Sequence, residues 1–444
     1  MLERALYFYR LRNTGEFIMK YALIHGILLT GEEDMEPILG KCILVDGENI
    51  LDIVEEGGDL TGYEIIDLKN QYIMPGLINL HVHLPASGKP KNKPTDPKKT
   101  VKLMTSNNLF RKIVLKLCTN FAQTQLKSGV TTIRTVGGVE DVDTKIRDRI
   151  NSNQIVGPRI LAANMAISVK GGHMADSLAY SATNAEESAN YAKKICSENP
   201  DLLKLMITGG VLDATVKGEP GVLKMQPELV KAACDVSHAN GLPVAAHVES
   251  TKGVEVALEN GVDTIEHGAK PTEHIIELFK ERKAAHITTI SPALPYALFD
   301  RAVSHATEME QYNGKVVFDG IVECAKACLE NDIPVGLGTD TGCPYITHYD
   351  MWREVNYFKK YCGVSNQFAL FTATKRNAQI AHIDDVTGTI EKGKCADMIV
   401  LKNNPLEDLQ SLRNVEMVIA RGKILSQPKV KKMPEVEKEL DRFL

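Results

Sequence analysis

Two histidines, His81 and His83, stand two residues apart in the apolar run GLINLHVHL at residues 76–84. Alternate side chains of a β-strand point to the same face, so we expect the two imidazole rings to lie side by side. Two neutral imidazoles that converge on one point bind a metal ion if further ligands reach them. A single buried histidine is commonly structural, so the prediction depends on ligands from elsewhere in the chain.

Four more residues of metal-binding or proton-transferring types lie at the ends of other apolar runs. Lys204 lies in DLLKLMITGG, His247 in VAAHVES, His267 in TIEHG and Asp340 in GLGTDTG. In a parallel α/β barrel the carboxyl ends of the strands meet at one face, where catalytic residues are found. Separate buried histidines and carboxylates would each need a partner of their own, so their joint occurrence favours a metal site.

The expected chemistry of Lys204 follows from its apolar surroundings. Burial disfavours the charged form of a lysine and lowers its pKa toward neutrality. A neutral amine adds carbon dioxide to give a carbamate, an anion that can bridge two cations. The alternative is an ammonium group paired with a carboxylate such as Asp201 or Asp340. We favour the carbamate because of the metal-type residues on the other strands.

The middle of the chain repeats one unit, a short apolar run followed by a helical pattern. The runs are residues 77–84, 131–136, 159–163, 202–207, 243–248, 263–267, 287–291 and 334–340. Helical patterns fall between most of them, for example at residues 184–197, 228–239, 251–260 and 318–331. Eight such units favour an α/β fold of the (β/α)8, or TIM, barrel type over an open doubly wound sheet. No glycine-rich nucleotide-binding signature follows any run.

Both ends of the chain carry short alternating segments typical of β-strands. We therefore expect a small β-sandwich domain built from residues 19–74 and 385–430, which flanks a barrel domain at residues 75–384. Residues 1–18 are expected to be an N-terminal extension and residues 431–444 a C-terminal tail. Met19 is an alternative start, which mass spectrometry of the native protein would test. The polar segment 85–99 is expected to be a mobile loop over the barrel mouth.

Composition limits the classes of function. A net charge of −5 over 444 residues, with no Lys/Arg-rich block, argues against nucleic-acid binding. No run approaches the ~18–20 apolar residues of a membrane helix, and the N-terminus lacks the apolar core of a signal peptide. Nine cysteines without a CxxC pair indicate reduced thiols and a cytoplasmic location. Cys324 and Cys328, four residues apart in a helical pattern, are expected to be ordinary buried thiols.

These motifs resemble the amidohydrolase superfamily from about residue 19 onward. The run PGLINLHVH at residues 75–83 fits its strand-1 motif, although Asn79 stands where Asp is more usual. Lys204, His247, His267 and Asp340 stand at the positions of strands 4, 5, 6 and 8. The segments SVKGGH, ITGGV and HVES resemble the imidazolonepropionase-like and Xaa-Pro dipeptidase-like group. The resemblance implies a binuclear, metal-dependent hydrolase of carbon–nitrogen bonds, similar to zinc enzymes that cleave N-acyl amino acids and dipeptides.

The implied mechanism uses two divalent metal ions, most simply Zn²⁺, with Mn²⁺, Fe²⁺ or Co²⁺ as substitutes, and a hydroxide that bridges them. One ion would be held by His81, His83, carboxylated Lys204 and Asp340, and the other by Lys204, His247 and His267. Asp340 would be the general base that passes a proton to the leaving amine. His173, in the glycine-rich loop after strand 3, would bind the substrate by donating a hydrogen bond to its carbonyl oxygen.

Other interpretations stay open. Cyclic-amide hydrolases of the imidazolonepropionase type share the metal chemistry, and related deaminases carry His-x-x-Glu after strand 5. Here position 250 is Ser and Glu249 comes one residue early. A non-catalytic oligomeric scaffold would have lost ligands that this chain retains.

The remaining acidic residues and the expected partners complete the interpretation. Glu249 is expected to orient a ligand, bind an ammonium group or be structural, and Glu266, which alternates away from His267, to be structural. The expected partner is a small-molecule substrate, with no nucleic acid and no membrane, and the chain is a candidate homo-oligomer.

Overall fold

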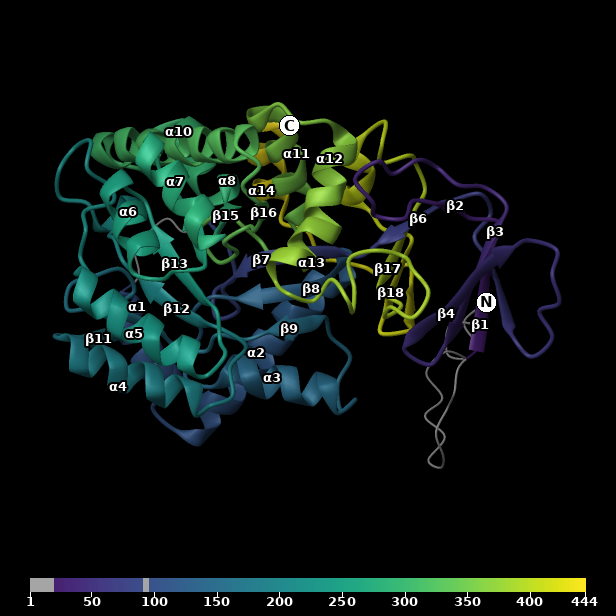
Figure 1. Ribbon diagram of the computed structural model, residues 1–444, viewed down its shortest axis with the longest axis horizontal. Coiled ribbons are helices and arrows are strands. Elements are labelled where there is room, and N and C mark those ends of the chain that lie inside the picture. The colour runs from purple at the N-terminus through teal and green to yellow at the C-terminus, as the bar shows by residue number, and fades with distance from the viewer. Residues whose placement is uncertain (1–19, 91–95) are drawn as a thin grey trace.

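The computed structural model describes residues 20–90 and 96–444 (Figure 1). The expected extension at residues 1–18 and part of the expected loop at 85–99 lie outside the described residues. No helix among the described residues is long and apolar enough to cross a membrane.

Parallel strands lie at the centre of the larger part of the molecule, and each expected apolar run overlaps one of them, although β15 starts two residues before its run. One sheet has seven strands in the order β11-β10-β12-β13-β14-β15-β16 and another has three in the order β7-β8-β9. The strands are β7 (Leu77–Val82), β8 (Val130–Thr135), β9 (Arg159–Leu161), β10 (Ala166–Val169), β11 (Ala179–Ala182), β12 (Leu203–Met206), β13 (Val244–Val248), β14 (Thr264–His267), β15 (Ala285–Thr288) and β16 (Val335–Leu337). All their pairings are parallel.

The two parallel sheets meet where β7 and β16 end. The backbone N–H of Asp340 donates to the carbonyl of His81 (2.9 Å), and that of His83 donates to the carbonyl of Thr341 (3.2 Å). An isolated parallel bridge also joins Val82 to Thr341. Among the described strands no ladder joins β9 to β10, so closure into one eight-stranded barrel stays a prediction.

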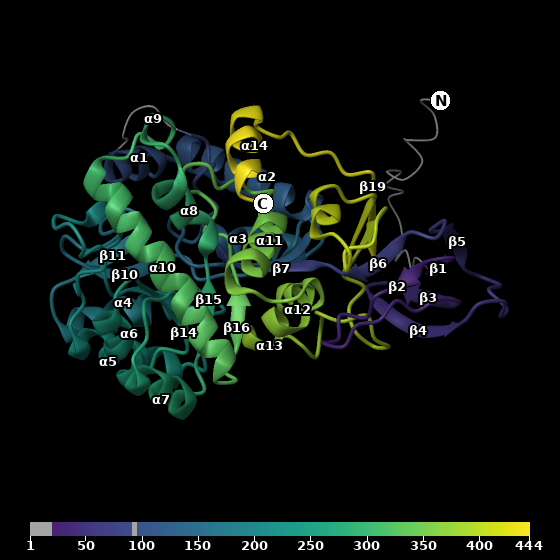
Figure 2. The same cartoon turned by 90° about the horizontal axis from the view of Figure 1, so that it is seen from above.

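Helices follow the strands and cover the parallel sheets on the outside (Figures 1 and 2). They are α1 (Pro97–Met104), α2 (Asn108–Lys127), α3 (Val142–Asn151), α4 (Ala185–Cys196), α5 (Pro227–Ala239), α6 (Thr251–Glu259), α7 (Glu273–Arg282), α8 (Ile290–Leu298), α9 (Arg301–Ser304), α10 (Glu308–Glu330), α11 (Met351–Cys362), α12 (Asn366–Phe371), α13 (Asn377–Ile380) and α14 (Pro434–Leu440). Polar caps start several of them, for example Ser250 before α6 and Thr307 before α10. Thr307 and Glu310 form a capping box.

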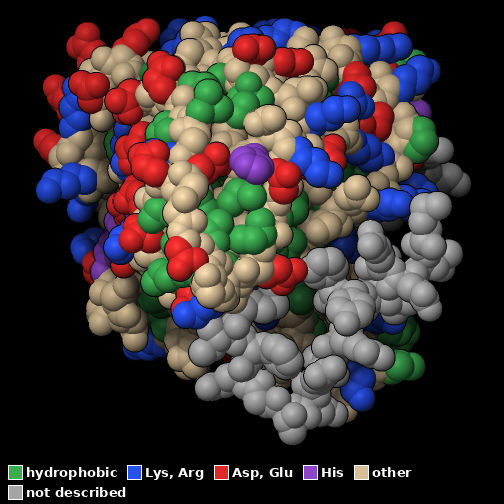
Figure 3. Space-filling view, turned by 90° about the vertical axis from the view of Figure 1, so that its right-hand side faces the viewer, with side chains coloured by type: hydrophobic (Ala, Val, Ile, Leu, Met, Phe, Trp, Pro, Cys, Tyr) green, Lys and Arg blue, Asp and Glu red, His purple; other side chains and the backbone are tan. Residues whose placement is uncertain are grey.

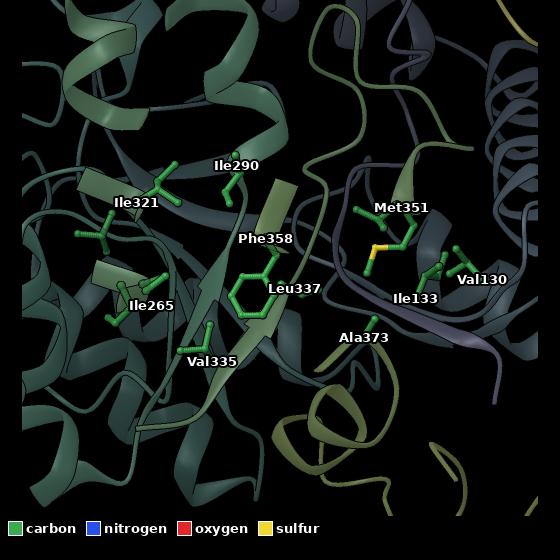
Figure 4. Close-up of a cluster of buried hydrophobic side chains, with 14 of the residues drawn as sticks. Val130, Ile133, Ile265, Ile290, Ile321, Val335, Leu337, Met351, Phe358 and Ala373 are labelled. Carbon is green, nitrogen blue, oxygen red and sulfur yellow. The ribbon is translucent and has the colours of Figure 1, made fainter. Parts of the chain in front are cut away.

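The main hydrophobic core lies between the strands and these helices. Val335 and Leu337 of β16 pack with Ile321 of α10 and Phe358 of α11, and all four are buried (Figure 4). In β12 and β13, alternate residues such as Leu203 enter this core, so the intervening side chains project to the opposite face. Lys204 and His247 are such intervening residues, and the alternation directs both into the interior.

Strands from both ends of the chain build a separate β unit. A four-stranded sheet has the order β4-β3-β1-β5, and a five-stranded sheet has the order β19-β18-β17-β6-β2. They contain β1 (Lys20–Ile24), β2 (Ile27–Leu28), β3 (Lys41–Asp46), β4 (Asn49–Glu55), β5 (Glu64–Asp67), β6 (Tyr72–Pro75), β17 (Met398–Leu401), β18 (Met417–Ala420) and β19 (Lys423–Ser426). The antiparallel pairing of β6 with β17 joins the two halves of the chain.

One apolar cluster contains residues of both of these sheets, among them Tyr21, Ile43, Met398 and Ile419. The sandwich arrangement itself stays a prediction. At this end of the molecule hydrophobic side chains are exposed among charged ones (Figure 3), and the exposed apolar residues of the unit include Leu51 and Ile65. No candidate site residue belongs to the unit.

The expected C-terminal tail contains a packed helix. Val436 and Leu440 of α14 are buried in the main core. Arg353 of α11 is fully buried and donates to Glu437 (2.9 Å) and to Asp441 (2.7 Å). This segment is therefore tied to the helices around the parallel sheets.

Candidate active site

The strand ends bring the expected side chains into one cluster. His83 Nε2 lies 3.2 Å and His81 Nε2 lies 3.5 Å from Oδ1 of Asp340. The ring centroid of His267 lies 5.0 Å from that of His81 and 4.6 Å from that of His247. Every member is largely removed from solvent, and the two most open, His83 and Asp340, expose 11% and 12% of their side chains.

Hydrogen bonds set which ring nitrogen of each histidine is free. A carbonyl oxygen only accepts, so His83 donates from Nδ1–H to Gly137 (2.8 Å), and His247 donates from Nε2–H to Gly209 (3.2 Å). His81 donates from Nδ1–H to the carboxylate of Glu266 (2.7 Å). The second nitrogen of each neutral ring is left as a lone pair, which is the form that binds a metal ion.

Burial keeps the rings neutral. Burial and the charge of Lys204 lower the pKa of His81 to about 4. Burial and the neighbouring basic groups hold the pKa values of His247 and His267 well below the usual range. His81, His247 and His267 are therefore uncharged at neutral pH, as metal ligands must be.

The donor atoms form two overlapping groups of metal-ligand spacing. Single donor atoms of His81, His267 and Asp340 lie within 4.8 Å of one another, and so do those of His247, Glu249 and His267. His267 is common to both groups. The sequence assigned His267 to one ion and His81 and Asp340 to the other, whereas here His267 is equally near both sets.

Lys204 is the clearest test of whether metal ions fit these residues. Its side chain is fully buried, and Nζ has no hydrogen-bond partner among the described residues. The suggested pairing with Asp201 is wrong, because Asp201 accepts from Arg147 (2.8 Å) and from the backbone of Ala162 (2.7 Å). Burial lowers the pKa of Lys204 to about 8. An unpaired buried amine is costly, and a carbamate bound to cations would remove that cost.

Two residues that the sequence analysis did not assign to the site hold the cluster in place. Glu266 accepts from His81 at one oxygen and from Arg134 (2.7 Å) at the other. Burial alone would raise the pKa of Glu266, but Arg134 and His81 outweigh burial and hold it well below the usual range. The expectation that Glu266 points away from the site is wrong.

The physical reason is the backbone at the end of β14. His267 adopts a left-handed conformation (φ 68°), so strict strand alternation stops there and Glu266 and His267 both reach the cluster. Asp340 is left-handed as well (φ 51°). Non-glycine residues in this region are uncommon and concentrate at functional sites. No sequence pattern indicates either conformation.

His173 stands beside the cluster. Its ring stacks on that of His247, with centroids 4.2 Å apart and planes 5° apart. Its Nδ1 lies 2.5 Å from Oδ2 of Asp213, which also accepts from the backbone N–H of Gly210 (3.1 Å). Asp213, from the loop after β12, thus orients His173, and no sequence pattern indicates this role.

Glu249 connects the cluster to an open cavity. Its Oε2 is buried without a partner among the described residues, and burial together with Asp340 raises its pKa to about 8. The cavity, about 630 Å³, lies between Glu249, Gly268 and the loop around Gly221 on one side and Gly320 of α10 on the other. Substrate-sized space is therefore present next to the cluster.

Comparison with known proteins places the chain among hydrolases. Residues 72–425 match the sequence model of the Amidohydrolase family. A crystal structure of a candidate prolidase from Bifidobacterium longum has a TM-score of 0.84 and 32% identity, over 96% of this chain and 99% of that one. A crystal structure of a Xaa-Pro dipeptidase with methionine in its active site has a TM-score of 0.80 and 28% identity, over 92% and 100%.

Two curated relatives are more distant. An ochratoxinase from Aspergillus niger is 23% identical over 437 residues, which is 91% of this chain and 86% of the relative. A 5-methylthioadenosine/S-adenosylhomocysteine deaminase from Bacillus cereus is 24% identical over 430 residues, 92% of each.

Proposed function

Since the chain belongs to the amidohydrolase family and is a hydrolase of carbon–nitrogen bonds, we propose that it cleaves the amide bond of dipeptides or N-acyl amino acids with the help of two divalent metal ions. The observation that carries the proposal is Lys204, a fully buried amine without a partner, set among neutral histidines and Asp340. The similarity to a Xaa-Pro dipeptidase supports the substrate class.

The proposed ligands are the residues expected from the sequence. They are His81, His83, Lys204 as its carbamate and Asp340 for one ion, and Lys204, His247 and His267 for the other. Zn²⁺ suits this mixture of nitrogen and oxygen donors. Bound ions would polarise the scissile carbonyl and make water acidic enough to attack it near neutral pH.

The chain's own residues handle the protons and orient the substrate. Burial alone would raise the pKa of Asp340, but His81 and His83 outweigh burial and hold it well below the usual range, so Asp340 is a carboxylate. As the general base it takes the proton of the attacking water and gives it to the leaving amine. His173 donates from Nδ1–H to Asp213, and in its protonated form it can also donate from Nε2–H to the substrate carbonyl oxygen.

The first prediction tests Lys204. Lys204→Met keeps a long apolar side chain but cannot form a carbamate. We expect bound metal to fall from two ions per chain to one or none. We also expect the rate of amide hydrolysis to fall at least ~100-fold, which is more than the loss of a residue that only supports a ligand would cause. Metal analysis and initial rates measure both. Lys270→Met, at an exposed cavity residue, is the control. An active variant with two ions would contradict the carbamate.

A substrate panel tests the reaction itself. Zinc-loaded protein should hydrolyse members of a dipeptide and N-acyl amino acid library faster than hydantoins, dihydroorotate or imidazolonepropionate. A preference for the cyclic amides would replace the proposal by cyclic-amide hydrolysis. No turnover of any amide, with two ions bound, would leave the oligomeric scaffold as the better account.

Deamination is the second candidate, and Glu249 is the observation that favours it. A protonated carboxyl group beside His247 and His267 can pass a proton to a leaving ammonia, and a deaminase is among the relatives. Glu249→Gln should then abolish ammonia release from aminopurine nucleosides. Ammonia release by the unmodified protein from such substrates, without amide hydrolysis, would decide for deamination.

A further inference from the structure

A second group of ligand-type side chains lies between the sheet and α10. His286 is on β15, and Cys324 and Cys328 are one turn apart on α10, which packs against β15. All three side chains are fully buried, and one donor atom of each lies within 4.8 Å of the others. The sequence predicted ordinary buried thiols from the spacing of the two cysteines alone, and the structure adds a histidine to them.

The histidine of this group has a free lone pair. His286 Nε2 lies 2.7 Å from the backbone carbonyl oxygen of His267, which only accepts, so Nε2 carries the proton. In the neutral ring Nδ1 is then an unprotonated acceptor. It is buried and accepts no hydrogen bond within the described part of the chain. A buried acceptor left without a donor costs free energy, and a cation would satisfy it.

We propose that His286, Cys324 and Cys328 form a binding site for one thiophilic divalent cation of the Zn²⁺ type, separate from the two ions of the proposed active site. Imidazole and thiolate are the ligands that Zn²⁺ takes in proteins. Binding releases the two thiol protons to solvent, and two thiolates with one divalent ion form a neutral unit. Neutrality matters in a site without water, where a net charge is strongly disfavoured, and it favours a divalent ion over Cu⁺.

The cavity beside α10 lies next to the site. Gly268 and Gly320 line this cavity, and Glu323, which precedes Cys324, lines it too. A Cβ atom on Gly268 would lie 3.1 Å from Cys324 Sγ and 2.8 Å from His286 Nε2, so the backbone of this cavity residue packs directly against two of the ligands. Besides Glu249, whose pKa burial raises to about 8, the cavity wall carries three acidic side chains against two lysines, which attracts cations. The three acidic side chains are Glu219, Asp319 and Glu323.

Cadmium titration of the metal-free protein tests the site without any reference to catalysis. Cd²⁺ bound to thiolates gives a charge-transfer band in the ultraviolet, and none of the proposed active-site ligands is a cysteine. We expect a band that saturates at one Cd²⁺ per chain and that is lost in Cys324→Ser and in Cys328→Ser. A wild-type protein without the band, or a band that persists in both variants, would overturn the proposal.

Two matched controls locate the thiolates. Cys234→Ser removes another fully buried thiol, on α5, and should keep the band. Cys343→Ser removes the thiol that lies 3.7 Å from Asp340 and should keep it as well. Loss of the band in Cys343→Ser would place the thiolate at the proposed active site and would also overturn the proposal.

X-ray absorption keeps the test decisive if the serine variants fail to fold. Zinc-loaded Cys343→Ser protein should show a sulfur shell at about 2.3 Å around zinc. Coordination by nitrogen and oxygen only would rule the site out. Because neither readout involves hydrolysis, failure here leaves the proposed amidohydrolase function untouched, and failure of that function leaves this site untouched.

Discussion

At the scale of single residues, Glu266 is not a proposed metal ligand, but its carboxylate sets the orientation and the proton position of His81, which is one. Its two oxygens connect His81 to Arg134, which also donates to the backbone carbonyl of Leu80 (2.7 Å). The carboxylate fixes the proton of His81 on Nδ1 and leaves Nε2 for a metal ion. It also neutralises Arg134 in a place that water does not reach.

Glu266→Gln should therefore affect metal binding and stability together. An amide keeps the size of the side chain but leaves Arg134 without a countercharge, so we expect metal affinity to fall about 10–100-fold and unfolding free energy to fall by about 3 kcal/mol or more. Metal competition and urea unfolding of metal-free protein measure these. Glu277→Gln, on the exposed side of α7, is the control. A variant with unchanged affinity would show that Glu266 has no role in orienting His81.

Glu354 predicts a pH dependence of stability. It is fully buried and accepts from the backbone N–H groups of Ile290 and Ser291 (2.8 Å each), and burial raises its pKa to about 7. The folded state then holds a proton that the unfolded state releases near pH 4.5, so stability from this group falls as pH rises from about 4.5 to about 7, by about 3 kcal/mol in all.

The measurement is the difference in unfolding free energy between wild type and Glu354→Gln across this pH range. The difference should move in favour of the glutamine variant as pH rises, because glutamine does not titrate. A difference that is constant with pH would show that Glu354 is not protonated in the folded protein.

At the scale of elements, the close approach of β7 and β16 determines whether the site assembles. Gly338 follows β16, and a Cβ atom there would lie 2.4 Å from Cβ and 2.7 Å from the backbone nitrogen of His81. Because this position has no side chain, the two strand ends come close enough for the backbone N–H of Asp340 to donate to the carbonyl oxygen of His81.

Gly338→Ala should separate these elements. The backbone at Gly338 is not left-handed, so alanine is conformationally allowed there and the effect is steric. We expect a lower melting temperature and the loss of at least one metal ion, measured by calorimetry and metal analysis. Gly58→Ala, where a Cβ atom would meet only a carbonyl oxygen at 3.9 Å, should change neither. Two bound ions in Gly338→Ala would disprove this role.

The part of the site that the sequence predicts is the part that lies on or directly beside regular strands. His81, Lys204 and His247 lie on strands, where alternation determines the face, and His83 directly follows β7; all four meet in the cluster. Glu266, Arg134 and Asp213 were missed because their contacts depend on a left-handed residue or on a loop conformation. Periodicity contains neither kind of information. Each expected run overlaps a strand, but β10 and β11, which extend the seven-stranded sheet, were not predicted.

At the scale of the whole molecule, ion pairs attach the C-terminal segment, α14 and the residues after it, to the helices around the parallel sheets. Glu437 and Asp441 both bind Arg353, and both bind Arg413 as well. Both guanidinium groups also lie over the ring of Trp352, with the central carbon 4.4 Å from the ring centroid in Arg353 and 5.1 Å in Arg413. Arg353 has no exposed surface, so its charge depends on these two carboxylates and on Asp350 (3.5 Å).

Replacing both carboxylates, as Glu437→Gln with Asp441→Asn, should leave a buried arginine short of countercharge. We expect the free energy of unfolding to fall by about 3 kcal/mol. The kcat of the folded protein should not change, because these ion pairs do not contact the candidate active site. Urea unfolding and initial rates measure the two effects. Glu435→Gln, an exposed residue of the same helix, is the control. An unchanged stability would show that other contacts hold the segment.

The pairing of β6 with β17 also imposes an order on biosynthesis. β6 ends at Pro75, yet its neighbour in the sheet begins at Met398, so the ribosome must add roughly 320 residues before the two can pair. At about 5–20 residues per second that interval is roughly 15–65 s. During it β6 presents an unpaired edge, the kind of surface that invites aggregation. The strands of the two parallel sheets are synthesised before that edge is covered, and the last strands to leave the ribosome complete a sheet that the first ones began.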